Sequence, residues 1–397
     1  MLSNILLSHS HFKGDIIRGD GVYLIDSAGK RYIDFVSGIW CAALGHKNIG
    51  INRCITDQIG KITHLNQNYI NHIADDAAEK LLGHTPFPDG KALFLNSGSE
   101  AVETAIRLAC EHTGRKNLLR FEQSYLGAYG LGGNRGDSAW KNLDLFKCLD
   151  CRCESCDESC PQLNDINFDR IAAFVMEPVM VGAGIRMAPI KAVHFITQKI
   201  KKHDGLFVAD EVTTGLGRVG RWLGSELLGV EPDIIAFGKI LGNGYPISAV
   251  AMRREIATNT EKKGLYYVQS HQNDPLGCRV ALEVIRQLES SKLIERSEKM
   301  GSILLNSLED IRSNHPIVAD ARGYGSLAGL EIQSAYSESI LKIHKHMLRS
   351  GFIIGVKPKD RLLRFLPPFI IKKIHIEEMI KSLDAIITSV EKKHGIS

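Results

Sequence analysis

The stretch PDIIAFGKILGNGYPISAV, residues 232–250, places one lysine in an unusual setting. An apolar run, Ile234–Phe237, leads up to Lys239, and Gly242 and Gly244 follow shortly after it. Such a run is typical of a strand that is buried on both faces, so the lysine stands where that strand ends. A lysine after a single strand is usually a surface residue, and only its companions elsewhere in the chain can indicate that this amine does chemistry.

Short apolar runs of the same kind alternate with helical patterns from about residue 60 to residue 285. They are ALFLN (92–96), NLLRF (117–121), IAAFVMEP (171–178), GLFVADEV (205–212), DIIAFG (233–238) and ISAVAM (247–252). Continuous apolar runs indicate strands covered on both faces. Their alternation with helices predicts an α/β fold with a doubly covered, largely parallel sheet.

The two ends of the chain predict a second, smaller domain. The segment GVYLIDSAGKRYIDFVSG (21–38) has two β-rich runs around a Ser-Ala-Gly turn, which predicts a hairpin. Near the other end, five apolar residues recur on one helical stripe: Ile376, Met379, Ile380, Leu383 and Ile387. We expect residues 1–60 to contribute to a small α+β domain, residues 61–285 to form the large domain, and residues 286–397 to complete the small domain.

Composition argues against several classes of protein. The 397 residues are 44% apolar and 24% charged, as in ordinary globular chains. A net charge of +4 is too small to predict a nucleic-acid surface, and no run reaches the roughly 18 apolar residues of a membrane span. The first residues show no signal-peptide pattern, so we expect a cytoplasmic chain whose nine cysteines are thiols or metal ligands rather than disulfides.

A carboxylate stands at a second strand end. In GLFVADEVTTGLGRVGRW (205–222), residues 206–209 are apolar and run straight into Asp210. Ligands of open α/β sheets bind beyond the carboxyl ends of the strands, so Asp210 and Lys239 are expected at one edge of the sheet. Taken alone, Asp210 could equally be a helix cap or a turn residue.

A candidate anion site follows a third strand, in LFLNSGSEAVETAIRLA (93–109). The strand is expected to end near Asn96, and a helix to begin at about Glu100 after Ser97, Gly98 and Ser99. Gly98 lets a ligand approach the backbone, Ser99 is expected to cap the helix, and free amides at a helix N-terminus suit a phosphate. An ordinary capped helix would have the same sequence pattern.

A phosphate cradle, a carboxylate and a lysine at one sheet edge form the set that pyridoxal 5'-phosphate requires. Its aldehyde forms a Schiff base with a lysine, whose amine must be neutral to react, and burial lowers the pKa of such an amine. A buried aspartate keeps the ring nitrogen protonated, because the opposite charge favours the pyridinium.

At this point the chain resembles the class III aminotransferases, pyridoxal-phosphate enzymes of fold type I. Relatives of this kind are the ornithine, acetylornithine, 4-aminobutyrate and ω-amino acid:pyruvate aminotransferases. The matching segments are SGSEAVETAIRLA, EPVMVGAG, VADEVTTGLGRVGRW, PDIIAFGKILGNGYP and RFLPPF, in family order from about residue 20 to residue 370. The resemblance implies a large, mostly parallel domain with a smaller α+β one, and transfer of an amino group from an amino acid or ω-amine donor to a 2-oxo acid.

The resemblance also implies roles around the cofactor ring. Lys239 would carry the cofactor as a Schiff base and move a proton on the substrate, and Asp210 would pair with the pyridinium. Val212 would pack on one face of the ring and Tyr125 on the other, although Tyr125 could also be plain core packing. Relatives usually have a histidine after that aromatic residue; here Leu126 stands there, which removes a polar contact.

Further cofactor contacts are implied by the phosphate side of the site. Ser97, Gly98 and Ser99 match the phosphate loop, and Glu177 matches the glutamate that follows a central strand. Ser270, in VQSHQNDPLG, aligns with the residue that reaches the phosphate from a neighbouring subunit, although the three residues after it depart from the family pattern. This match implies at least a homodimer with its active site at the subunit interface.

Substrate contacts are implied at two positions. Arg364 matches the arginine that binds the substrate carboxylate, with a structural ion pair as its alternative. Trp40 is expected to wall the pocket or to fill an interface. Ornithine and 4-aminobutyrate aminotransferases have a glutamate that pairs with this arginine where the present chain has Gly182, so donors of their type are less favoured. Thr213 stands where many relatives have a glutamine that contacts the cofactor.

Five cysteines fall within thirteen residues of one predicted loop: Cys148, Cys151, Cys153, Cys156 and Cys160. The Cys-x2-Cys spacings resemble zinc ligation, while an iron–sulfur cluster and free thiols remain as alternatives, so the metal is left unknown.

Two other functions compete with amino transfer. The same constellation serves class III epimerases, phospholyases, decarboxylases and aminomutases, which differ in the Cα bond that is broken. A metal- or redox-sensing protein that uses the cysteine loop on a retired enzyme fold is a third hypothesis. The intact pair of Lys239 and Asp210 argues against it.

Overall fold

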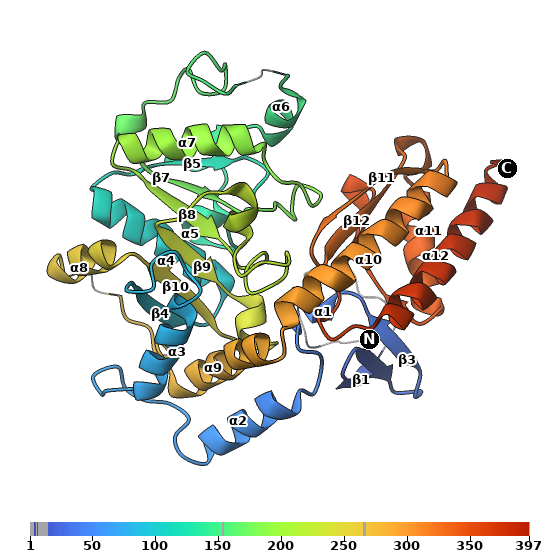
Figure 1. Cartoon of the computed structure of the whole chain (residues 1–397), viewed down its shortest axis with the longest axis horizontal. Coiled ribbons are helices and arrows are strands. Elements are labelled where there is room, and N and C mark those ends of the chain that lie inside the picture. The colour runs from blue at the N-terminus through green and yellow to red at the C-terminus, as the bar shows by residue number, and fades with distance from the viewer. Residues whose placement is uncertain (1–3, 5, 7–14, 153–154, 265–266, 397) are drawn as a thin grey trace.

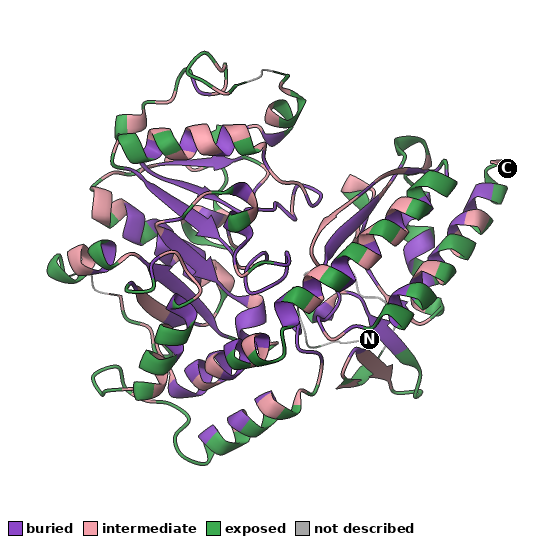
Figure 2. Ribbon diagram, in the orientation of Figure 1, coloured by how far each residue is buried: buried purple, intermediate pink, exposed green. Residues whose placement is uncertain are grey.

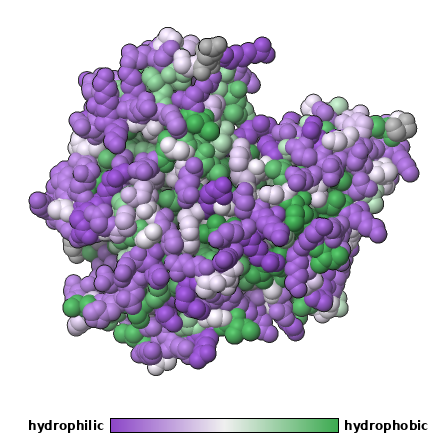
Figure 3. Space-filling view, in the orientation of Figure 1, coloured by the Kyte–Doolittle hydropathy of each residue, from purple (hydrophilic) through white to green (hydrophobic). Residues whose placement is uncertain are grey.

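The computed structural model describes the chain except for residues 1–3, 5, 7–14, 153–154, 265–266 and 397. Figure 1 shows a larger body around a twisted sheet, beside a second body in which three long helices lie against smaller sheets. In the part of the chain that is described, no helix combines the length and the apolar character needed to cross a bilayer. Figure 3 shows a face on which hydrophilic residues predominate, with apolar ones scattered among them.

The larger body is built on a seven-stranded sheet with the strand order β4-β10-β9-β8-β7-β5-β6. Every neighbouring pair from β9 to β6 is parallel, and only β10 runs antiparallel to both of its neighbours. The predicted α/β fold with a mostly parallel sheet is confirmed. The strands are β4 (Lys91–Leu95), β5 (Asn117–Phe121), β6 (Trp140–Leu143), β7 (Ile171–Met176), β8 (Leu206–Asp210), β9 (Ile234–Phe237) and β10 (Ser248–Met252).

Helices cover both faces of this sheet, and the central strands are buried throughout (Figure 2). On β8, Val208 packs in a cluster with α4 (Gly98–Thr113) and α8 (Arg254–Lys262), while Phe207 and Ala209 pack with α7 (Ile190–Lys202). Successive residues of a strand point to opposite faces, which explains this alternation. The helices α2 (Ile49–Ile59), α3 (His72–Leu82) and α9 (Pro275–Ser290) share a further cluster with β9.

One detail of the α4 start differs from the sequence-based expectation. The expected cap, Ser99, is wrong: the N-cap is Ser97, whose hydroxyl accepts the Glu100 amide at 3.2 Å. The helix begins at Gly98, so Ser99 already lies within its first turn. The Ser99 hydroxyl instead accepts the Ala128 amide at 3.1 Å, which ties the helix start to the loop that follows β5.

The second body has an antiparallel sheet in the order β11-β12-β15-β14. Its strands are β11 (Val318–Tyr324), β12 (Leu327–Ile332), β15 (Leu362–Phe365) and β14 (Gly355–Lys357), and its helices are α10 (Leu293–Asn314), α11 (Ser339–Arg349) and α12 (Lys373–Lys393). The predicted stripe on α12 is confirmed, since four of its five residues are buried in this core and Ile380 packs against it.

The N-terminal hairpin belongs to the same core. It is formed by β2 (Tyr23–Asp26) and β3 (Arg31–Asp34), with β1 (Ile16–Asp20) on one side and β13 (Phe352–Ile353) parallel to β3 on the other. Residues 49–59, in contrast, pack as α2 with α3 and α9 of the larger body. The division into residues 1–60, 61–285 and 286–397 stays a prediction.

Candidate active site

Lys239 lies just beyond β9, in a backbone conformation that is uncommon for a residue with a side chain. Its φ angle is +44°, in the left-handed region, and it opens a single turn, Lys239–Gly242. Such conformations cost free energy and cluster at functional sites. The Lys239 Nζ donates a hydrogen bond to the Thr213 hydroxyl at 2.6 Å. The strand end therefore holds the amine in one defined place.

Three ionisable groups meet at this edge of the sheet: the partly buried Lys239, and the buried Asp210 at the end of β8 and Glu177 after β7. Burial is the largest influence on each. It lowers the pKa of Lys239, and it raises the pKa of Asp210 to about 7 and that of Glu177 to about 8. The Lys239 charge opposes the increases in the pKa values of Asp210 and Glu177. The charges of these two carboxylates oppose the decrease in the pKa of Lys239. A lowered lysine pKa increases the neutral, nucleophilic fraction of the amine at neutral pH.

The two carboxylates also position backbone segments beside the lysine. Glu177 accepts the Tyr125 amide at 2.8 Å, and Asp210 accepts the Val212 amide at 3.0 Å. Tyr125 and Val212 are the residues predicted to flank the cofactor ring. The Tyr125 side chain is half exposed, so one of its faces is open to a ligand.

Two glycines let Val212 pack closely against the start of α4 and the loop before Lys239. A Cβ atom at Gly98 would lie 2.5 Å from a Val212 methyl carbon, so any larger residue there would force Val212 to move. A Cβ atom at Gly238 would lie 3.2 Å from the same carbon and 3.3 Å from the Gly98 Cα atom. The first-turn amides of α4 therefore stand close to the loop that carries Lys239, where an anion can bind them.

A cavity of about 810 Å³ opens over the lysine. It brings together five of the eleven predicted site residues: Trp40, Tyr125, Glu177, Lys239 and Arg364. It does not include Ser97, Gly98, Ser99, Asp210, Val212 or Ser270. Asp210 acts on Lys239 through its charge, whereas Ser270 is exposed on the loop before α9, away from this cavity.

Arg364 comes from β15 of the second body and reaches the same cavity. Its guanidinium carbon lies 5.1 Å from the centre of the Trp40 ring, and the Lys239 Nζ also lies 5.1 Å from it. Burial lowers the pKa of Arg364, and its buried Nε has no hydrogen-bond partner within the described structure. Because an unpaired buried donor is costly, this nitrogen is suited to an incoming carboxylate.

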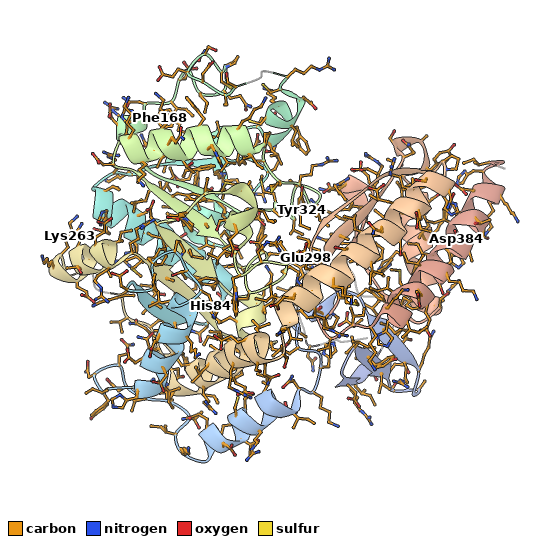
Figure 4. All side chains as sticks on the ribbon, viewed as in Figure 1. His84, Phe168, Lys263, Glu298, Tyr324 and Asp384 are labelled. Carbon is orange, nitrogen blue, oxygen red and sulfur yellow. The ribbon has the colours of Figure 1, made fainter. Side chains whose placement is uncertain are left out.

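Trp40 lies where the two bodies meet. It packs against an apolar cluster that includes Val179 and Val181 of the larger body and Leu327 and Leu366 of the second. Tyr324 of β11 packs against the same cluster, and Figure 4 shows its side chain between the two bodies. This wall of the cavity is therefore formed by both bodies.

Arg218 is a residue of this region that sequence reasoning missed. It is fully buried and donates to the Pro367 carbonyl at 2.7 Å, the Ser326 hydroxyl at 3.2 Å and the Trp40 carbonyl at 3.4 Å. Burial lowers its pKa to about 9. The only signal for it was its place in the matched segment VADEVTTGLGRVGRW, since its partners come from distant parts of the chain.

The outer wall of the cavity is cationic. Eight Lys or Arg residues line the cavity against three Asp or Glu residues. The partly buried Glu331 carboxylate alone binds Arg186 at 3.3 Å, Arg322 at 2.9 Å and Arg361 at 2.9 Å. An excess of positive charge favours acidic ligands.

These features fit pyridoxal phosphate. The first-turn amides of α4 are suited to an anion, Gly98 and Gly238 let Val212 pack closely beside them, Asp210 provides a buried carboxylate, and Lys239 provides a partly buried amine.

Comparisons with known proteins agree with this geometry. The sequence profile described as "Aminotransferase class-III" matches residues 7–132 and 139–387. The chain is 30% identical to the acetylornithine aminotransferase of Aquifex aeolicus over 97% of this chain and 100% of that protein. It is also 30% identical to a leucine/methionine racemase of Thermococcus litoralis, over 92% of this chain and 88% of that protein. A Bacillus anthracis aminotransferase structure is 28% identical, with a TM-score of 0.82 over 95% of this chain and 93% of that one.

Proposed function

The chain belongs to the class III aminotransferases and is a pyridoxal-phosphate-dependent enzyme, and from this premise we propose that Lys239, Asp210 and Arg364 carry its reaction. The reaction moves an amino group from an amino acid or ω-amine donor to a 2-oxo acid. The observation that carries this proposal is that Lys239, whose charge is coupled to the buried Asp210 carboxylate, and Arg364, whose buried Nε has no described partner, line one cavity.

The chain's own residues would divide the work. When bound, pyridoxal phosphate withdraws electrons from the substrate Cα and carries the amino group between the two half-reactions. Lys239 would hold the cofactor covalently and would move the proton of the substrate Cα. Asp210 would keep a proton on the ring nitrogen, and Gly98 and Ser99 would hold the phosphate.

The substrate is bound at its acidic end. Arg364 holds the carboxylate of the 2-oxo acid in bidentate fashion, and Trp40 lies against both Arg364 and Lys239. The functional unit is a homodimer or larger, in which each subunit contributes Ser270 to the phosphate site of the other. The exposed position of Ser270, outside the cavity of its own chain, supports this arrangement.

A single half-reaction tests amino transfer against the alternatives. Purified holoenzyme mixed with an amino donor and no 2-oxo acid is expected to convert its cofactor to the pyridoxamine form, which absorbs at shorter wavelength. A racemase or epimerase accumulates little of that form. Loss of donor chirality without the spectral change would therefore contradict the proposal.

Arg364→Ala is expected to raise the Michaelis constant for the 2-oxo acid by roughly 10²-fold, the scale of a lost charge-assisted pair. An amine donor without a carboxylate should be affected much less, because it makes no such pair. Steady-state kinetics with both substrates measure the difference. Equal losses for the two substrates would show that Arg364 is structural.

In the Gly182→Glu variant, the introduced carboxylate is expected to pair with Arg364 and so to compete with the carboxylate of the 2-oxo acid. Both residues line the cavity, and a Cβ atom at Gly182 would have only ordinary contacts, at 3.4 Å from the Gln123 carbonyl and 3.6 Å from the Tyr125 Cβ. The new carboxylate should raise the Michaelis constant for the 2-oxo acid about tenfold, which corresponds to about 1.4 kcal/mol. Gly182→Gln, of equal size and no charge, is the control. Efficient turnover of ornithine at its δ-amine by the wild type would contradict the premise that the wild-type chain has no carboxylate that pairs with Arg364 in this way.

A further inference from the structure

A cluster outside the active site brings the ligand atoms of three side chains together: His64, His271 and Asp274. One ligand atom of each lies within 4.8 Å of those of the other two. His64 comes from the segment between α2 and α3, and the other two residues come from the segment that leads into α9. In the described part of the chain no three cysteine sulfurs come this close, and Cys153 of the cysteine-rich loop lies outside the described residues.

The Asp274 carboxylate faces the two histidines instead of capping its helix. Asp274 is the N-cap residue of α9, yet its side chain makes no hydrogen bond to the first turn. Aspartate is among the preferred N-cap residues, and such a cap contributes about 1 kcal/mol. One carboxylate oxygen lies 3.2 Å from the His64 Nδ1 and the other lies 2.7 Å from the His271 Nδ1. The carboxylate is therefore placed for the two rings, at the expense of the helix cap.

The spacing of these atoms suits one metal ion. Ligands of a tetrahedral zinc ion lie about 2.0–2.1 Å from the metal, and so roughly 3.3–3.4 Å from one another. The two distances between nitrogen and oxygen are within about 1 Å of this value, so an ion can enter with small movements of exposed side chains. Two imidazoles and a carboxylate are a common ligand set for zinc, and they leave a fourth position open for water.

We propose that His64, His271 and Asp274 bind one zinc ion. The side chains of the two histidines are 46% and 57% exposed, so the ion can reach them from solvent. Among the described residues, no Lys or Arg forms an ion pair with Asp274 that would compete with the ion. His271 and Asp274 also line a cavity of about 270 Å³, which has room for the water that completes the coordination.

The ion would join two segments that already contact each other. The Gln67 side chain donates to the Gln269 carbonyl at 2.6 Å, and the Asn71 side chain donates to the Asn273 carbonyl at 2.7 Å. A bond from the metal to His271 adds a third link, directly after Ser270. The ion is therefore structural: it restrains the segment 269–274 and takes no part in amino transfer. The metal site itself does not depend on the role proposed for Ser270.

The first test compares zinc binding by two forms of the full-length holoenzyme, both freed of metal with a chelator. Equilibrium dialysis against zinc, followed by elemental analysis, is expected to show one equivalent per chain less in the double variant His64→Ala/His271→Ala than in the wild type. Zinc held by cysteines would be the same in both proteins and would cancel. A difference of less than about a tenth of an equivalent would overturn the proposal.

Single substitutions separate ligation from folding. Asp274→Asn keeps the size of the side chain and is expected to weaken zinc binding at this site at least about tenfold, because an amide is a poorer ligand than a carboxylate. The matched control is His72→Ala, which removes an exposed histidine at the start of α3 and should bind zinc as the wild type does. Unchanged affinity in Asp274→Asn, or an equal loss in His72→Ala, would contradict the assigned ligands.

Hydrogen exchange tests where the ion acts. Adding zinc to the wild-type holoenzyme is expected to slow amide exchange in the segment 269–274, and to have no such effect in the double variant. This measurement does not depend on turnover, so it distinguishes failure of the metal site from failure of the proposed reaction. Equal protection in both proteins, or protection confined to the cysteine-rich loop, would overturn the proposal.

Discussion

Lys239→Ala is expected to reduce turnover by at least about 10⁴-fold, because the variant loses the amine proposed both to bind the cofactor covalently and to move the substrate proton. The variant should still bind pyridoxal phosphate, since the α4 amides and Asp210 are unchanged. Steady-state rates measure the first effect, and cofactor absorbance after gel filtration measures the second.

Borohydride reduction tests the same residue directly. Reduction should fix the cofactor on the wild-type chain, and peptide mass spectrometry should locate it at Lys239. The matched control is Lys357→Ala, since Lys357 also lines the cavity but pairs with Asp360 at 2.6 Å. That variant should still be labelled at Lys239. A label on any other lysine would contradict the assignment.

The central strands were predictable because they are covered on both faces, which leaves continuous apolar runs in the sequence. The edge strand β6 was not predicted, because its sequence WKNL is buried only at Trp140 and Leu143. The cap of α4 was placed two residues late, since serines flank Gly98 on both sides and the sequence does not say which one leaves the helix.

The candidate site was predictable in part for a similar reason. Asp210 and Lys239 follow buried strands, and parallel strands carry their C-terminal ends to one edge. The distances that unite Lys239, Trp40 and Arg364 depend on how the second body meets the first. Only the family resemblance pointed to them. The positive φ angle of Lys239 and the buried contacts of Arg218 are tertiary features with no local sequence pattern.

The roles assigned to all the site residues stay predictions, including those of Ser97, Gly98, Ser99, Tyr125, Val212 and Ser270. The geometry supports the roles of the residues beside Lys239 more than the role of Ser270. The role of Ser270 requires a second subunit, and a dimer that retained full cofactor affinity after Ser270→Ala would argue against that role.

Asp210→Ala should lower the rate by roughly 10²- to 10⁴-fold. Breaking a buried ion pair costs about 3–5 kcal/mol, and about 1.4 kcal/mol corresponds to a tenfold change in rate. Asp210→Asn, which keeps the size and removes the charge, should lose nearly as much. Glu211→Gln is the control: Glu211 is equally buried, but it accepts the Gly224 and Ser225 amides, so its loss should lower stability rather than rate.

The lysine itself provides the internal check on this result. The Asp210 charge opposes the decrease in the Lys239 pKa, so its removal should lower that pKa further and leave more neutral amine at pH 7. Borohydride labelling of Lys239 in Asp210→Asn should therefore remain efficient while turnover falls. If labelling and turnover fell together, Asp210 would be needed to position the lysine, and its assigned pairing with the ring nitrogen would be wrong.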